Sequence, residues 1–107
     1  MEGRKYNKLV RDRVPEIIKG NGEEPVTYIL GDIEYKKALD DKLLEEVNEY
    51  LKEDNLEEIA DIYEVICAIL EYKGISFEDM QSIAIDKKNN RGGFYSRIFL
   101  KDVIAKV

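Results

Sequence analysis

The feature that most restricts the fold is the stretch at residues 59–70, "IADIYEVICAIL", in which ten of twelve residues are apolar. At helical spacing these residues cover the whole circumference, which is typical of a helix buried on all sides. Asp61 and Glu64 are its only polar residues. A buried ionised carboxylate is costly unless it is paired with a cation or binds a metal. The pattern therefore predicts a central helix and a cationic partner for Asp61.

A second amphipathic helix is predicted just before this one. Apolar residues recur at helical spacing over residues 33–54, and Asp32 is the expected N-cap. Asp54 and Asn55 interrupt the pattern before a helix over residues 56–73, which Gly74 should end. Because the connection is so short, the two helices should pack as an antiparallel hairpin.

Shorter elements complete the expected fold. Proline in the first turn indicates a short helix at residues 15–19, and a capping pattern indicates a third long helix at residues 77–90, with two glycines after it. Residues 25–30, "PVTYIL", favour a strand, and the extended tail after residue 93 could pair with it. The expectation is a mainly α helical bundle with one short strand pair, forming a single domain over residues 1–107.

Carboxylates gather at two places on the hairpin. Glu45, Glu46 and Glu49 share one face of the first helix, and Glu58 and Asp61 share one face of the second. The alternative to a binding site is a solvated acidic face. However, the short turn brings both groups side by side, and two like charges ~4 Å apart repel by about 4 kcal/mol at an effective dielectric of 20. A bound cation would remove this repulsion.

The residue types limit which cation this could be. The chain has no histidine and one cysteine, which argues against zinc and against the usual nucleophile triads. Ligation by oxygen alone favours Mg²⁺ or Mn²⁺, and no EF-hand loop supports calcium. The prediction is a magnesium site with a defined set of residues: Glu46, Glu49, Glu58 and Asp61 as ligands, with Glu45 beside them.

Charge and hydropathy narrow the expected partners and location. The 23 acidic residues against 17 basic ones give a formal net charge of -6, which disfavours nonspecific binding to nucleic acid or to an anionic membrane. No apolar run approaches the ~20 residues of a membrane span, and no signal-peptide core follows the N-terminus. A cytoplasmic location is expected.

The motifs resemble those of the all-α nucleoside triphosphate pyrophosphatase superfamily, which includes MazG, phosphoribosyl-ATP pyrophosphatase and the dimeric dUTP pyrophosphatases. The segments "YNKLVRDRVPEII", "EEVNEYL", "EIADIYEVI" and "RGGFYSRIFL" are similar to a group of short MazG-like house-cleaning pyrophosphatases. The resemblance implies a Mg²⁺-dependent release of pyrophosphate from a nucleoside triphosphate. It gives Glu45 the role of a ligand or of the general base. The eight-residue spacer between Glu49 and Glu58 is shorter than in many members.

Cations are expected to hold the phosphates in such an enzyme. The resemblance suggests Lys87 and Arg91, with Asn90 assisting. A second group comes from the N-terminal segment and consists of Lys8, Arg11 and Arg13. The alternative for both groups is an ordinary charged surface.

Two other functions are compatible with the same residues. One is hydrolysis of phosphoribosyl-ATP by the same chemistry. The other is a non-catalytic interaction module whose acidic helices bind a basic partner. The apolar stretch at residues 59–70 is too long for one small chain to cover, so a homodimer or homotetramer is expected in either case.

Overall fold

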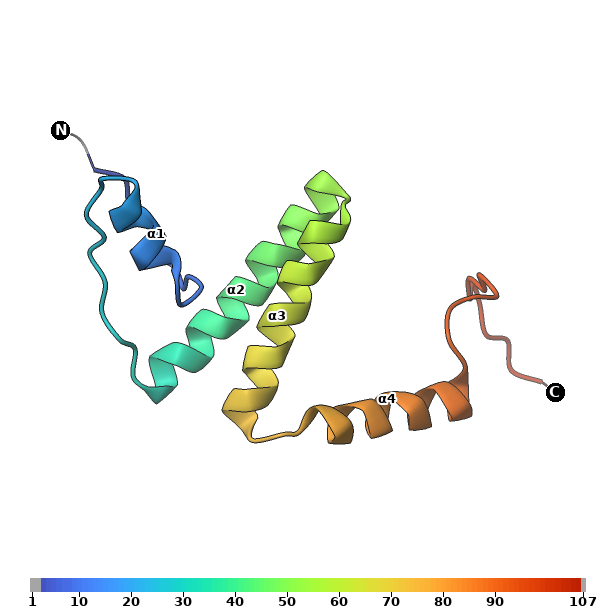
Figure 1. Ribbon diagram of the computed structural model, residues 1–107. Coiled ribbons are helices and arrows are strands. Elements are labelled where there is room, and N and C mark those ends of the chain that lie inside the picture. The colour runs from blue at the N-terminus through green and yellow to red at the C-terminus, as the bar shows by residue number, and fades with distance from the viewer. Residues whose placement is uncertain (1–2, 107) are drawn as a thin grey trace. The chain divides into compact units, whose positions relative to one another are not determined.

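The computed structural model describes residues 3–106 and contains four helices in this part of the chain. They are α1 (Val14–Gly20), α2 (Asp32–Glu53), α3 (Leu56–Lys73) and α4 (Phe77–Arg91) (Figure 1). The described residues form no strand, so the fold is mainly α, as predicted. The chain divides into two compact units, Met1–Gly74 and Ile75–Val107. The expectation of a single domain stays a prediction.

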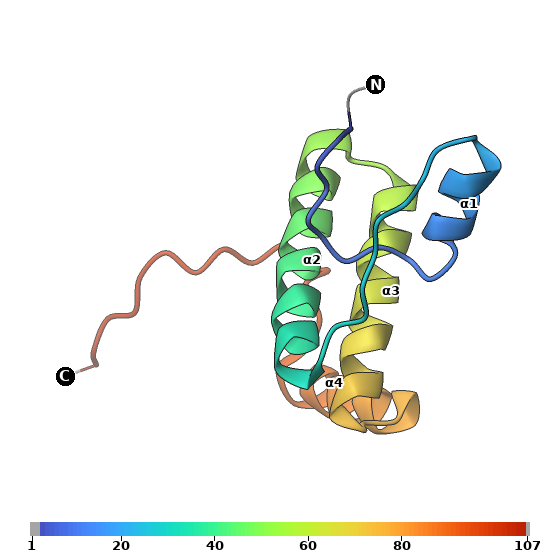
Figure 2. The ribbon, with the colours of Figure 1, turned by 90° about the vertical axis from the view of Figure 1, so that its left-hand side faces the viewer.

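Helices α2 and α3 pack side by side as the predicted antiparallel hairpin (Figures 1 and 2). The turn between them is made by two residues. Asp54 adopts the left-handed conformation with φ 51°, and its N–H donates to the carbonyl of Tyr50. The side chain of Asn55 accepts a hydrogen bond from the backbone N–H of Glu58 at 3.0 Å and so caps α3. The turn therefore ends one helix and starts the next within two positions.

One detail of α2 differs from the prediction. Gly31 occupies the N-cap position with extended backbone angles, and Asp32 is the first helical residue. No side-chain hydrogen bond caps this end of α2. Asp32 instead places a negative charge in the first turn, where it interacts favourably with the positive end of the helix dipole.

The core of the first unit lies between α2 and α3. Leu39 is 1% exposed and Val65 is 8% exposed. The rings of Tyr35 and Tyr72 meet edge to face, with their centroids 5.7 Å apart. The Tyr72 hydroxyl donates to the backbone carbonyl of Asp32 at 3.4 Å, which joins the end of α3 to the start of α2. These contacts fix the register of the hairpin.

Helix α3 is not buried on all sides within the first unit, and its burial by self-association stays a prediction. Ile59 is 47% exposed and Ile66 is 37% exposed, because only the face toward α2 is covered in the first unit. An apolar face on α3 is therefore left uncovered by the other elements of the first unit.

The predicted strand pair is wrong. Residues 25–30 form no strand, and Val26 and Ile29 are each 97% exposed. The tail at residues 98–106 also contains no strand. β-branched and aromatic residues favour a strand only where a neighbouring strand supplies hydrogen bonds and side-chain contacts. The described part of the chain supplies no such neighbour.

The second unit contains α4. The side chain of Ser76 accepts a hydrogen bond from the N–H of Asp79 at 3.1 Å, which confirms the predicted cap. Gly92, with φ 81°, follows the last helical residue, Arg91. A Cβ on Gly93 would come within 2.6 Å of the Tyr95 ring, so a larger residue there would require the exposed Tyr95 side chain to shift. The two glycines thus end the helix, as the sequence predicted.

Candidate metal centre

Three carboxylates from the two hairpin helices converge on one point. Glu46 comes from α2, whereas Glu58 and Asp61 come from α3 one helical turn apart. One oxygen of each lies within 4.8 Å of the others. We call these residues the acidic triad. Glu46 is 9% exposed, and the other two side chains are half-buried. The hairpin therefore brings together three of the four predicted ligands.

The fourth predicted ligand, Glu49, is exposed and lies outside the triad. Its charge nevertheless acts on Glu58. The pKa of Glu58 is raised above its ordinary value, first by partial removal from water and then by the negative charges of Asp61, Glu49 and Glu46. Within residues 3–106, Glu58 takes part in no ion pair. A nearby cation would therefore favour its ionised form.

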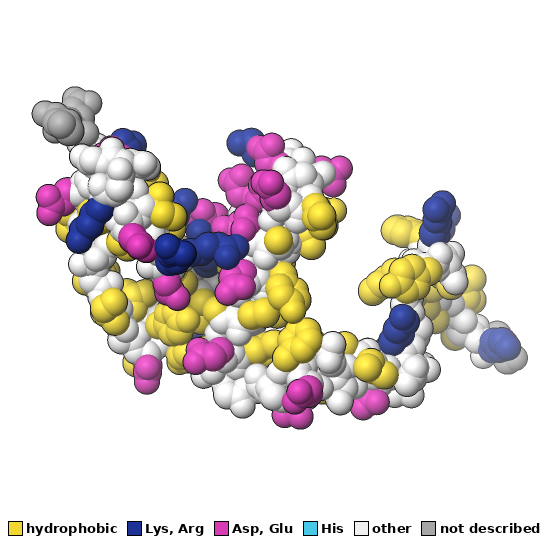
Figure 3. Space-filling view, viewed as in Figure 1, with side chains coloured by type: hydrophobic (Ala, Val, Ile, Leu, Met, Phe, Trp, Pro, Cys, Tyr) yellow, Lys and Arg dark blue, Asp and Glu magenta, His cyan; other side chains and the backbone are white. Residues whose placement is uncertain are grey.

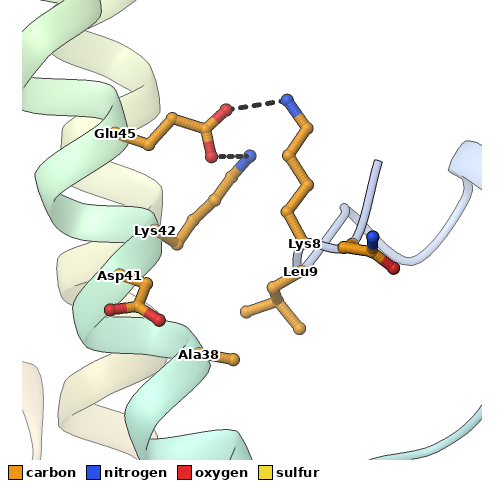
Figure 4. Close-up of a pocket in the computed structure, with 7 residues that line it drawn as sticks. Lys8, Leu9, Ala38, Asp41, Lys42 and Glu45 are labelled. Atoms are coloured by element: carbon orange, nitrogen blue, oxygen red, sulfur yellow. Dashed lines mark hydrogen bonds and ion pairs between the residues drawn. The ribbon is translucent and has the colours of Figure 1, made fainter. Parts of the chain in front are cut away.

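Glu45 is held between two lysines (Figure 4). The Lys8 ammonium donates to Glu45 Oε1 at 2.8 Å, and the Lys42 ammonium lies 3.4 Å from Oε2. Burial alone would raise the pKa of Glu45, but the hydrogen bond from Lys8 and the charges of both lysines outweigh burial and lower it. The hydrogen bond to Glu45 also raises the pKa of Lys8. Glu45 is therefore kept ionised.

Arg11 is the cationic partner that the sequence required for Asp61. Its Nη2 donates to Asp61 Oδ1 at 2.7 Å. Lys8 and Arg11 both belong to the segment before α1, which crosses from α2 to α3 (Figure 2). Figure 3 shows Lys and Arg side chains lying against acidic side chains there. The side chain of Arg13, by contrast, is 82% exposed, and it pairs with Glu16 in the first turn of the adjacent helix α1 at 3.1 Å. The structure thus brings only two of the three N-terminal cations to the cluster.

Sequence reasoning did not identify Lys42. Its ammonium lies 3.3 Å from Glu46 Oε1 as well as beside Glu45, and its side chain is only 17% exposed. The sequence does contain a pattern that predicts these contacts. Lys42 precedes Glu45 by three positions and Glu46 by four, the spacings at which side chains of one helix meet. Lys42 is the cation that holds the α2 acids in place.

The charges of this region do not cancel. The acids are Glu45, Glu46, Glu49, Glu58 and Asp61, and the cations that pair with them are Lys8, Arg11 and Lys42. These acids outnumber the cations that pair with them, so the region keeps an excess of negative charge that a bound cation would reduce.

The donor set fits Mg²⁺ or Mn²⁺. Both ions prefer oxygen ligands, and Mg²⁺ binds them at about 2.1 Å in octahedral geometry, so neighbouring oxygens lie about 3 Å apart and opposite ones about 4.2 Å apart. The triad oxygens lie within 4.8 Å of one another, so their side chains would have to draw together to ligate one ion. Glu46, Glu58 and Asp61 could therefore hold such an ion, with Glu49 close enough to act on Glu58.

The remaining predicted residues lie in the second unit. Lys87, Asn90 and Arg91 are exposed in the last two turns of α4. In the same unit, the Lys88 ammonium lies 5.5 Å from the centre of the Tyr95 ring. The phosphate-binding roles of Lys87, Asn90 and Arg91 stay predictions.

None of the helices in the described residues is long and apolar enough to cross a membrane. No family model matches the chain, and no solved structure does. A protein of Mycolicibacterium smegmatis, whose name is "Uncharacterized protein", is 57% identical over 42 residues. The match covers 39% of this chain and 43% of that protein, so the chain spans less than half of its relative. The resemblance to the all-α pyrophosphatases stays a prediction.

Proposed function

We propose that this protein is a Mg²⁺-dependent nucleotide pyrophosphohydrolase, which cleaves a canonical or noncanonical NTP or dNTP to the monophosphate and pyrophosphate. The observation that carries the proposal is the convergence of the Glu46, Glu58 and Asp61 oxygens within 4.8 Å, from two helices joined by a two-residue turn. The excess of acidic over basic side chains in this region supports a cation as the ligand.

The acidic triad would hold Mg²⁺, with Glu49 as a further ligand, and Mn²⁺ is the natural substitute. When bound, the ion would neutralise charge on the phosphate oxygens of the substrate. The half-buried position of the triad supports this role, because partial exclusion of water strengthens electrostatic interactions at the site.

Glu45 is the proposed general base. Its lowered pKa keeps the carboxylate ionised near neutral pH, which is the state that accepts a proton. In the proposed step, water attacks one phosphorus of the α–β phosphoanhydride while Glu45 takes a proton from that water. The bond between the attacked phosphorus and the bridging oxygen breaks, the bridging oxygen leaves with the other phosphorus, and the products are the monophosphate and pyrophosphate. Lys42, which contacts both Glu45 and Glu46, keeps the base next to the ligands.

Lys8 and Arg11 are the proposed phosphate-binding groups of the first unit, because they already lie at the acidic cluster. Arg13 lacks this support, since it pairs with Glu16 of α1 and not with an acid of the cluster. The role of Lys87, Asn90 and Arg91 as additional phosphate ligands is retained from the resemblance alone.

A product assay tests the proposal. The purified protein is incubated with a panel of ribo- and deoxyribonucleoside triphosphates and with phosphoribosyl-ATP, in Mg²⁺ or in EDTA, and pyrophosphate is separated from orthophosphate. We expect metal-dependent pyrophosphate and monophosphate. Glu46→Gln should abolish the reaction, whereas Asp40→Asn, on the same helix and paired with Lys36, should not. Turnover of phosphoribosyl-ATP alone would assign the alternative substrate. Orthophosphate with a nucleoside diphosphate would contradict the mechanism.

The second candidate is a non-catalytic interaction module. The exposed apolar residues Ile59 and Ile66 on α3 favour it, since they present a surface for another chain. They support self-association as a homodimer or homotetramer under both functions. Metal separates the two candidates. An interaction module keeps its partner binding in EDTA and in Glu46→Gln, whereas the enzyme loses activity in both.

A further inference from the structure

The three cations at the acidic cluster are held in different ways. Lys42 is carried by α2, and its side chain is 17% exposed. Lys8 and Arg11 are carried by a segment without helix or strand, and their side chains are 42% and 58% exposed. Exposed ion pairs are weak, because water and salt screen them. Lys8 and Arg11 are therefore exchangeable, whereas Lys42 belongs to the fixed frame of the site.

Arg11 and a metal ion would use the same carboxylate. Arg11 donates to Asp61 at 2.7 Å, and Asp61 is a member of the acidic triad. Two cations drawn to one carboxylate repel each other, so a bare metal ion at Asp61 weakens the Arg11–Asp61 pair and favours movement of Arg11 away from it. A bare ion offers the displaced guanidinium no new partner. The exchange is then opposed in part by the loss of the Arg11–Asp61 pair.

A metal ion that arrives with a triphosphate changes this balance. The phosphate oxygens are anionic and accept hydrogen bonds from guanidinium and ammonium groups. Arg11 and Lys8, once displaced from Asp61 and Glu45, lie beside the incoming phosphates and can pair with them. The same two residues thus oppose the bare ion and favour the ion with its phosphates.

We propose that Lys8 and Arg11 make the site selective for a metal–triphosphate complex over the bare divalent ion, by exchanging carboxylate partners for phosphate partners. The proposal rests on the proposed function, because it requires the acidic triad to bind a divalent ion. It goes beyond that function by assigning the N-terminal segment two opposite effects, one on each ligand.

The first measurement uses Mn²⁺ alone. Isothermal titration compares the full-length wild type with Arg11→Gln and with the matched control Arg4→Gln, which removes the same charge from the same segment at a residue paired with Glu23. We expect Arg11→Gln to bind Mn²⁺ about tenfold more tightly than the wild type, and Arg4→Gln to differ less than about twofold. Lys8→Gln provides an independent second variant and should change affinity in the same direction.

The second measurement uses the complex of Mn²⁺ with inorganic tripolyphosphate, which contains no base or sugar. Here we expect the sign to reverse, with Arg11→Gln binding about tenfold more weakly than the wild type. Equal Mn²⁺ affinity in Arg11→Gln and Arg4→Gln, or tighter binding of both ligands by Arg11→Gln, would overturn the selectivity while leaving the pyrophosphohydrolase proposal intact. If no variant binds Mn²⁺ in either form, both proposals fail.

Discussion

Arg11 and Asp61 are separated by fifty positions in the sequence, yet a 2.7 Å hydrogen bond joins the guanidinium of one to the carboxylate of the other. Through this contact, and through the pair between Lys8 and Glu45, the segment before α1 becomes part of a site whose acids all lie on the α2–α3 hairpin. The acids, their cations and the helical frame that holds them can each be tested separately.

Asp61→Asn should remove metal binding and activity without unfolding the protein. The amide cannot neutralise a divalent cation, and we expect turnover to fall by about 100-fold or more, since even residues that only orient metal ligands contribute about 10–100-fold. Stability should change little, because the pair lost with Arg11 is exposed and worth about 0–1 kcal/mol. Steady-state kinetics and thermal unfolding measure both effects. A fully active Asp61→Asn variant would exclude the residue from the site.

Glu58→Gln should stabilise the metal-free protein at neutral pH. The pKa of Glu58 is raised in the folded state, so folding disfavours its ionised form. The free energy of unfolding therefore decreases as the pH rises above the pKa that Glu58 has in the unfolded state. In EDTA at pH 7, the variant should melt at a higher temperature than the wild type. As the pH falls through the pKa of Glu58, both side chains become neutral, and the difference should vanish.

Bound metal should make the wild type melt at a higher temperature than Glu58→Gln, the reverse of the order expected in EDTA. At a concentration 100 times Kd, a ligand that binds only the folded state adds about 2.7 kcal/mol. The wild type should gain this stabilisation in Mn²⁺, and Glu58→Gln should gain little. If Mn²⁺ stabilises both proteins equally, Glu58 is not a ligand.

Lys8→Gln should shift the acid limb of the pH–rate profile to higher pH. The hydrogen bond from Lys8 lowers the pKa of Glu45, so its removal raises that pKa, and the base becomes protonated at a higher pH. The maximum value of kcat/KM should fall as well, but the pH at the midpoint of the acid limb reports the pKa of Glu45. Lys5→Gln, an exposed neighbour on the same segment, is the control and should leave the midpoint unchanged.

Leu39→Ala should destabilise the first unit strongly. Leu39 is 1% exposed between α2 and α3, and truncation of a fully buried leucine costs about 2–5 kcal/mol. Leu44→Ala, at a residue of the same helix that is 62% exposed, should cost less than about 1 kcal/mol. Urea unfolding of the two variants checks the comparison. Similar losses would mean that an assembly buries Leu44 too.

Ile66→Asp should weaken self-association. Ile59 and Ile66 lie seven positions apart on one face of α3, and a charge at this face would disfavour its burial against a second copy. Analytical ultracentrifugation over a range of concentrations should show a shift toward monomer in Ile66→Asp. The exposed substitution Glu57→Gln, at the start of the same helix, is the control.

The hairpin and its acids were predictable because their determinants are local. The apolar period defines α2 and α3, Asp54 and Asn55 end one helix and begin the other, and a spacing of three residues places Glu58 and Asp61 on one face. Such features depend on the backbone geometry of a helix and on a short connection.

The contacts of the N-terminal segment were not predictable in the same way. Residues 3–13 have no apolar period, so nothing in the sequence specifies that Lys8 meets Glu45 and Arg11 meets Asp61 while Arg13 pairs with an acid of α1. Residues 25–30 have a clear local pattern, but the pattern predicts the wrong structure. Their strand propensity is clear, but no neighbouring strand exists in the described chain to make use of it.

The two-residue turn at Asp54 and Asn55 limits which sequence changes the acidic triad can tolerate. Each residue added to or removed from a helix rotates the next part of the chain by about 100° and moves it by about 1.5 Å. An insertion or deletion near the turn would therefore carry Glu58 and Asp61 away from Glu46, whereas a substitution there would leave their spacing intact. In this chain, a one-residue change in length at the turn should therefore harm the acidic triad more than a substitution that keeps Asp54 left-handed and Asn55 as the cap of α3.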